Sequence, residues 1–73
     1  MIITIDQLKQ IVNAGGGLVI DASTMTFNQL KDISSAANNG ARITIKSISG
    51  LTASQLIELA TLAPGMIVFD QTS

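Results

Sequence analysis

The chain repeats one nine-residue pattern, which in its middle copy reads Met25-Thr26-Phe27-Asn28-Gln29-Leu30-Lys31-Asp32-Ile33. The same order of residue types (apolar, Thr, any, small polar, Gln, Leu, any, polar, apolar) recurs at residues 3–11 and 51–59. Each copy contains Thr-x-x-Gln, the capping box in which the threonine hydroxyl accepts from a backbone amide of the first turn and the glutamine binds back to the cap. Three boxes in one register predict three helices, one after each threonine.

Apolar residues around each box support the same interpretation. The residue before each threonine and the leucine four positions after it occupy the two hydrophobic-staple positions. These pairs are Ile3 with Leu8, Met25 with Leu30, and Leu51 with Leu56. Apolar residues then recur at steps of three and four, which is typical of a helix with one buried face. We expect the helices to end where glycine, asparagine or proline appears, at residues 15–17, 38–40 and 64–65.

A short segment rich in β-branched residues follows each helix end. These segments are Leu18–Asp21, Arg42–Lys46 and Ile67–Asp70. Strands separated by helices pair in parallel through right-handed crossovers. We therefore predict an α/β fold of three tandem helix-strand repeats, with a three-stranded parallel sheet in the order 1-2-3 and all helices on one face. The side chains expected to face the helices are Leu18, Ile20, Ile43, Ile45, Ile67 and Phe69.

The opposite face of the sheet is expected to carry two rows of side chains across the strands. One row contains Val19, Thr44 and Val68. The other row contains Asp21, Lys46 and Asp70. The charges alternate in sign along the second row, and opposite charges that meet across neighbouring strands favour this register.

The repeats span approximately residues 3–23, 25–47 and 51–71, so residues 1–73 are expected to form one domain. A strand-helix unit of this length in tandem resembles the short α/β solenoids of leucine-rich-repeat proteins. The Leu-x-x-Leu-x-Leu-x-x-Asn spacing of that family does not occur in the strand segments. The resemblance implies a protein-binding module that uses its sheet face, and it transfers no functional residue.

Composition narrows the classes of function. The 73 residues include no cysteine and no histidine, which excludes disulfides, thiolate metal sites and the commonest general base. Four basic and five acidic residues give a net charge of -1, so we expect neither a nucleic-acid nor a membrane partner, and no cofactor. The charged fraction of 12% is about half of the usual ~25%, which favours association of the surface with other proteins.

The segment Met1–Asp6 has neither the basic region nor the apolar length of a signal peptide. No apolar run approaches the ~20 residues that span a bilayer. We therefore expect a cytoplasmic protein.

Two features could carry chemistry. Gly15-Gly16-Gly17 ends a helix and enters a strand, whereas phosphate-binding loops lead from a strand into a helix, so we interpret these glycines as a helix stop. Asp21 and Asp70 leave the carboxyl ends of parallel strands, where open α/β sheets bind ligands, and Lys46 lies between them. A small-ligand or weakly enzymatic site at these three residues is the alternative function. We assign no catalytic, cofactor-binding or metal-binding residue.

The leading interpretation is a non-enzymatic protein-interaction or self-assembly module. The third helix carries Ile57 and Leu62 where the second carries Lys31 and Ala36, although terminal repeats usually present a polar capping face. The outer strands also expose backbone edges. We expect a homo-oligomer, with another protein as the second class of partner. Head-to-tail stacking would place Asp70 beside Asp21 of the next chain, so a closed dimer is favoured over a filament.

Overall fold

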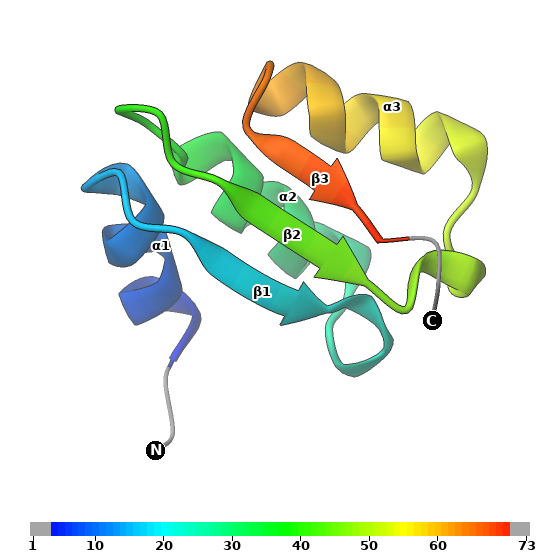
Figure 1. Cartoon of the computed structure of the whole chain (residues 1–73). Coiled ribbons are helices and arrows are strands. Elements are labelled where there is room, and N and C mark those ends of the chain that lie inside the picture. The colour runs from blue at the N-terminus through cyan, green and yellow to red at the C-terminus, as the bar shows by residue number, and fades with distance from the viewer. Residues whose placement is uncertain (1–3, 71–73) are drawn as a thin grey trace.

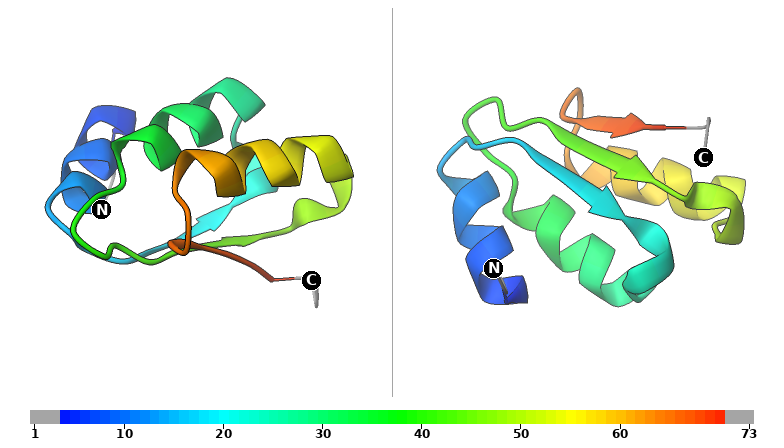
Figure 2. Two further views of the ribbon diagram at one scale, coloured as in Figure 1. Left: turned by 90° about the horizontal axis from the view of Figure 1, so that it is seen from above. Right: turned by 60° about the horizontal axis from the view of Figure 1, so that its bottom comes forward.

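In the computed structural model, which describes residues 4–70, three helices cover one face of a three-stranded sheet (Figures 1 and 2). The helices and strands are α1 (Ile5–Asn13), β1 (Leu18–Asp21), α2 (Phe27–Ala36), β2 (Ile43–Lys46), α3 (Ala53–Leu62) and β3 (Ile67–Phe69). Both strand pairs are parallel, and the strand order is β1-β2-β3. The predicted fold class is confirmed.

All three predicted capping boxes are present. In each box the threonine hydroxyl accepts from the backbone amide of the glutamine at 3.1–3.2 Å. The glutamine Oε1 accepts from the backbone amide of the threonine at 2.9–3.0 Å. Of the apolar residues that precede the caps, Met25 and Leu51 pack against the core. Ile3, which begins the first predicted repeat and staple, lies outside the described residues, as does residue 71 at the end of the third repeat.

Each helix ends within a few residues of the position predicted from glycine, asparagine or proline. Gly15 follows α1 with a φ of +95°, a left-handed conformation that favours glycine. A Cβ atom at Gly15 would lie 3.1 Å from the Asn39 carbonyl oxygen, so the loop after α1 packs closely against the loop after α2. The side-chain amide of Asn39 also donates to the Asn13 carbonyl at 3.3 Å. The connections of successive repeats therefore lie against each other.

The strand register is the predicted one. The aligned sets are Leu18, Ile43 and Ile67; Val19, Thr44 and Val68; and Ile20, Ile45 and Phe69; Asp21 is then aligned with Lys46. The strands are slightly shorter than predicted, because β2 begins at Ile43 instead of Arg42 and β3 ends at Phe69. The Asp70 amide nevertheless donates to the Ile45 carbonyl at 2.8 Å, so backbone pairing reaches the predicted end of the third strand.

The core lies between the sheet and the helices. Ile43 and Ile45 of the central strand are completely buried. The helices contribute buried Val12, Leu30, Ile33 and Leu59. On the opposite face Val19 is 70% and Val68 39% exposed, so the sheet has one open face as predicted.

Two short 3-10 helices that the sequence did not predict connect the strands to the next helices. They are η1 (Ala22–Thr24) and η2 (Ile48–Gly50). Ser47 begins the second connection in a left-handed conformation, with a φ of 59°. The connection from β2 to Thr52 is one residue longer than that from β1 to Thr26, which accounts for part of the unequal spacing of the repeats.

The helical layer is wider than the sheet. Neighbouring strands lie ~4.8 Å apart, whereas packed helices lie ~8–10 Å apart. Figure 1 shows the consequence, because α1 and α3 extend beyond the two edges of the sheet. The end of the stack is therefore formed mainly by α3, with β3 set back beside it.

Removing one cap should measurably destabilise the fold. We expect Thr26→Ala to lower the free energy of unfolding by about 1 kcal/mol, because the first turn of α2 loses its hydroxyl acceptor. Thr26→Ser keeps the acceptor and should retain most of that stability. Urea unfolding of both variants measures the difference, and equal stability of Thr26→Ala and the parent chain would contradict the role of the box.

A buried serine gives the opposite prediction. Ser34 of α2 is 1% exposed, and within residues 4–70 its hydroxyl has no hydrogen-bond partner. An unsatisfied buried polar group costs ~1–3 kcal/mol, and alanine is the better helix former. We expect Ser34→Ala to stabilise the protein by about 1 kcal/mol. The exposed neighbour provides the control, since Ser35→Ala should give only the smaller gain in helix propensity; a loss of stability in Ser34→Ala would show that the hydroxyl is used.

Candidate functional site

The carboxyl ends of the strands bring together the charged residues of the alternative site. Asp21 is aligned with Lys46 in the sheet, and Asp70 directly follows β3 and pairs through its backbone with β2. The three residues thus lie at one end of the sheet, in the order that the sequence predicted.

The closest partner of the Asp21 carboxylate is local. Its Oδ1 accepts from the Ser23 hydroxyl at 2.6 Å and from the Ser23 amide at 2.9 Å, which caps η1. These two hydrogen bonds, followed by one with Ser47, hold the pKa of the Asp21 carboxyl below its ordinary value of 3.8, and the charge of Lys46 has the smallest effect. The structure therefore assigns Asp21 first to the turn after β1 and only second to the charge row.

This arrangement does not resemble a catalytic centre. A carboxylate with a lowered pKa stays ionised at neutral pH, whereas a general acid or base works best when its pKa lies near the operating pH. No group of three or more acidic side chains suitable for a metal ion occurs among residues 4–70. Asp21, Lys46 and Asp70 contribute to the turn and the sheet. A ligand at this position would meet a polar surface whose opposite charges partly neutralise each other.

A groove beside these strand ends lies between η1 and η2. It has a volume of about 410 Å³. Its lining residues are Ala22, Ser23, Met25, Phe27, Ser47, Ser49, Gly50, Leu51 and Gln55. The lining combines hydroxyl and amide groups with apolar side chains and contains no charged residue, so the groove suits a small neutral polar molecule better than an ion. Sequence reasoning missed this groove, although Ser23 and Ser49 each stand three residues before a capping threonine and the repeat alignment could have paired them.

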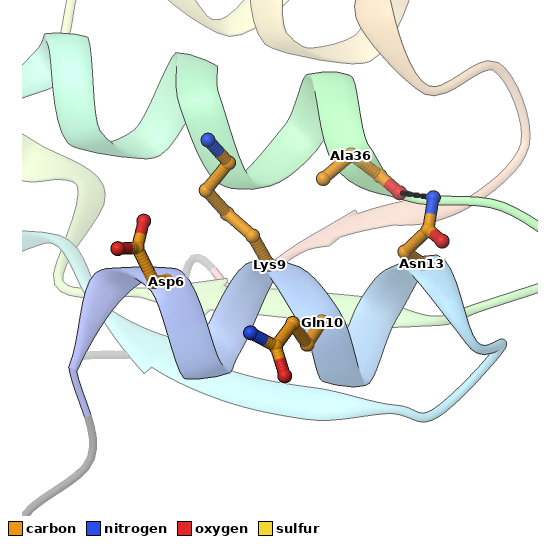
Figure 3. Close-up of a pocket in the computed structure, with 5 residues that line it drawn as sticks. All are labelled: Asp6, Lys9, Gln10, Asn13 and Ala36. Atoms are coloured by element: carbon orange, nitrogen blue, oxygen red, sulfur yellow. Dashed lines mark hydrogen bonds between the residues drawn. The ribbon is translucent and has the colours of Figure 1, made fainter.

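A second groove separates α1 from α2 (Figure 3). The Asn13 side chain donates to the Ala36 carbonyl at 3.2 Å across it, and Lys9 extends from α1 toward α2. Gln10 also lines this groove, together with Asp6 (Figure 3). The groove therefore shows which flank of α1 faces the next helix.

Repeat positions then orient α3. Lys9, Lys31 and Ile57 are each the fifth residue after a capping threonine. In α2 this residue faces the next helix, because the Lys31 ammonium lies 3.2 Å from Oε1 of Glu58 in α3. It also lies 5.6 Å from the centre of the Phe27 ring. Ile57 therefore occupies the flank of α3 that faces away from α2, and it is 67% exposed.

Leu62 occupies the other flank. Its equivalent in α2 is Ala36, which contacts Asn13 of the preceding helix. Leu62 is accordingly 38% exposed and lies on the side of α3 toward α2. The two residues singled out in the third helix therefore lie on different flanks, and Ile57 marks the flank that no helix covers among residues 4–70.

Comparison with known proteins gave no match: no family model fits the chain, and no curated protein or solved structure is significantly similar to it. Within residues 4–70, every helix is too short or too polar to cross a lipid bilayer. The resemblance to leucine-rich-repeat proteins therefore stays a prediction. The fold itself is a stack of three helix-strand units with one open sheet face.

The acid limb of the stability curve tests the role of Asp21. Because its folded pKa is lowered, the carboxylate stabilises the fold above its unfolded pKa, and this contribution is lost as the pH falls through the folded value. We expect Asp21→Asn to be less stable than the parent chain at pH 7 and the difference to vanish in strong acid. Lys46→Met should have a smaller effect, which shrinks with salt.

Urea unfolding between pH 2 and pH 7 measures both effects. A greater loss in Lys46→Met than in Asp21→Asn would show that the cross-strand contact, and not the turn, holds the carboxylate.

Proposed function

We propose that the protein is a non-enzymatic protein-interaction module that assembles through the end of the stack formed by α3. One observation carries this proposal: Ile57 is exposed at the position where α1 and α2 carry lysines. A terminal helix of a repeat stack normally presents polar residues on its outer flank. In this chain the position carries lysine in α1 and α2, whereas the outer flank of α3 carries an exposed isoleucine.

The exposed isoleucine has a definite energetic value. Complete burial of such a side chain contributes roughly 1.5–3 kcal/mol, so covering the exposed two thirds of Ile57 is worth roughly 1–2 kcal/mol. This is too little to hold a complex alone, because association costs several kcal/mol of translational and rotational freedom. The contact must therefore extend over the end of the stack, which favours a protein partner over a small molecule.

The groove between η1 and η2 favours a second candidate function, the binding of a small neutral ligand. The observation that supports it is that two equivalent serines, Ser23 and Ser49, line the groove together with the apolar side chains of Met25 and Leu51. This groove adjoins Asp21, so the proposal is a more specific form of the small-ligand site expected at the carboxyl ends of the strands.

Sedimentation velocity separates the two functions. For the assembly module we expect the average mass to rise between low and high micromolar concentrations of the chain. The reason is that the fraction of associated chains increases with the total concentration. A chain that stays monomeric throughout this range, and whose melting temperature rises with a panel of small neutral polyols and amides, would support the ligand-binding function and overturn self-assembly.

A further inference from the structure

We infer that the partner at this end is a second copy of the chain, packed α3 against α3 about a two-fold axis. The inference rests on the proposed function and deepens it, because it names the occupant of the uncovered flank and the symmetry of the contact. Two other geometries would also cover this end: a head-to-tail continuation of the repeats, and pairing of β3 edges.

Head-to-tail stacking is opposed at two places. The Lys31–Glu58 pair shows that the fifth residue after one cap faces the sixth residue after the next. In a continued stack Ile57 would face Gln10 of the next copy, so an apolar side chain would desolvate an amide without satisfying it. In the sheet, Asp70 would lie beside Asp21 of that copy, which places like charges on neighbouring strands.

A two-fold contact avoids both conflicts. Residues at steps of three and four from Ile57 lie beside it on α3, and they are Ala53, Ser54, Ala60 and Thr61. The Thr61 hydroxyl donates to the Ile57 carbonyl at 2.8 Å. This flank carries no charge, and its alanines allow two helices to approach closely. Glu58, the acidic residue of α3, is engaged with Lys31 on the side toward α2. A two-fold axis places the same uncharged surface on both subunits, so Ile57 and its neighbouring alanines meet their own copies.

The shape of the end favours helix contact over strand contact. Because α3 extends beyond β3, an approaching copy meets α3 first, and pairing two β3 edges would bring the two α3 helices into the same space (Figure 1). A contact made mainly by the ten residues of α3 is small for a specific interface, which predicts a weak, concentration-dependent dimer.

Thiol cross-linking tests the symmetry, because the chain contains no cysteine. We expect Ile57→Cys alone to form covalent dimers with a short bismaleimide at least tenfold faster than Val19→Cys, whose site is equally exposed but lies on the open sheet face. A head-to-tail contact predicts the reverse pattern: neither Ile57→Cys nor Gln10→Cys reacts alone, and only their mixture gives the cross-linked dimer. That outcome would overturn the two-fold axis and leave self-assembly intact.

Sedimentation of charged variants tests the surface independently. Ile57→Lys places on α3 the residue that α1 and α2 carry at this position, and it should weaken dimerisation at least tenfold while the circular dichroism spectrum is unchanged. Val19→Lys is the matched control and should associate like the parent chain. If the parent chain associates and only Val19→Lys disrupts it, the contact lies on the sheet and the inference about α3 fails. If the parent chain is monomeric at high micromolar concentration, self-assembly itself fails.

Discussion

The whole structure depends on covering one face of a three-stranded parallel sheet. Ile43 and Ile45 of the central strand are buried only because each helix returns over that same face. Parallel sheets are usually covered on both faces, and this one has a single covered face in a chain of 73 residues. The apolar burial is therefore modest, and local devices such as the capping boxes carry a larger share of the stability than they would in a larger domain.

The sequence was sufficient for the caps, the strand order and the register, because two independent periodicities converge on them. Thr-x-x-Gln marks each helix start, and the alternation in β2 fixes which residues face the core. The 3-10 connections could not be predicted in the same way, since Ser47 adopts a left-handed conformation without being glycine or asparagine. The main partner of Asp21 could not be predicted either. The charge pattern favours Lys46, but the turn after β1 brings Ser23, two residues away, onto the carboxylate.

Helical periodicity also left the uncovered flank of α3 undecided. A spacing of about 100° per residue places Ile57 and Leu62 on different margins of the helix, but it does not say on which side the neighbouring helix lies. The Lys31–Glu58 ion pair supplies that direction, because it fixes which flank of α2 faces α3. Repeat equivalence then transfers the answer to Ile57. A single contact between helices is thus enough to determine which flank of α3 faces away from α2.

The distribution of charge along the stack bears on how an assembly would stop. Lysine suits a position between helices, because the Lys31 ammonium lies over the Phe27 ring and also reaches Glu58 of the next helix. Isoleucine at the equivalent position of α3 has no polar tip that can reach water. If the two ends of the stack were complementary, such a surface would add further copies without limit. At the opposite end, Gln10 is the repeat equivalent of Glu58, and Asp21 lies on the edge strand β1. Gln10 does not complement Ile57, and Asp21 does not complement Asp70, so the proposed association through α3 would end at the pair.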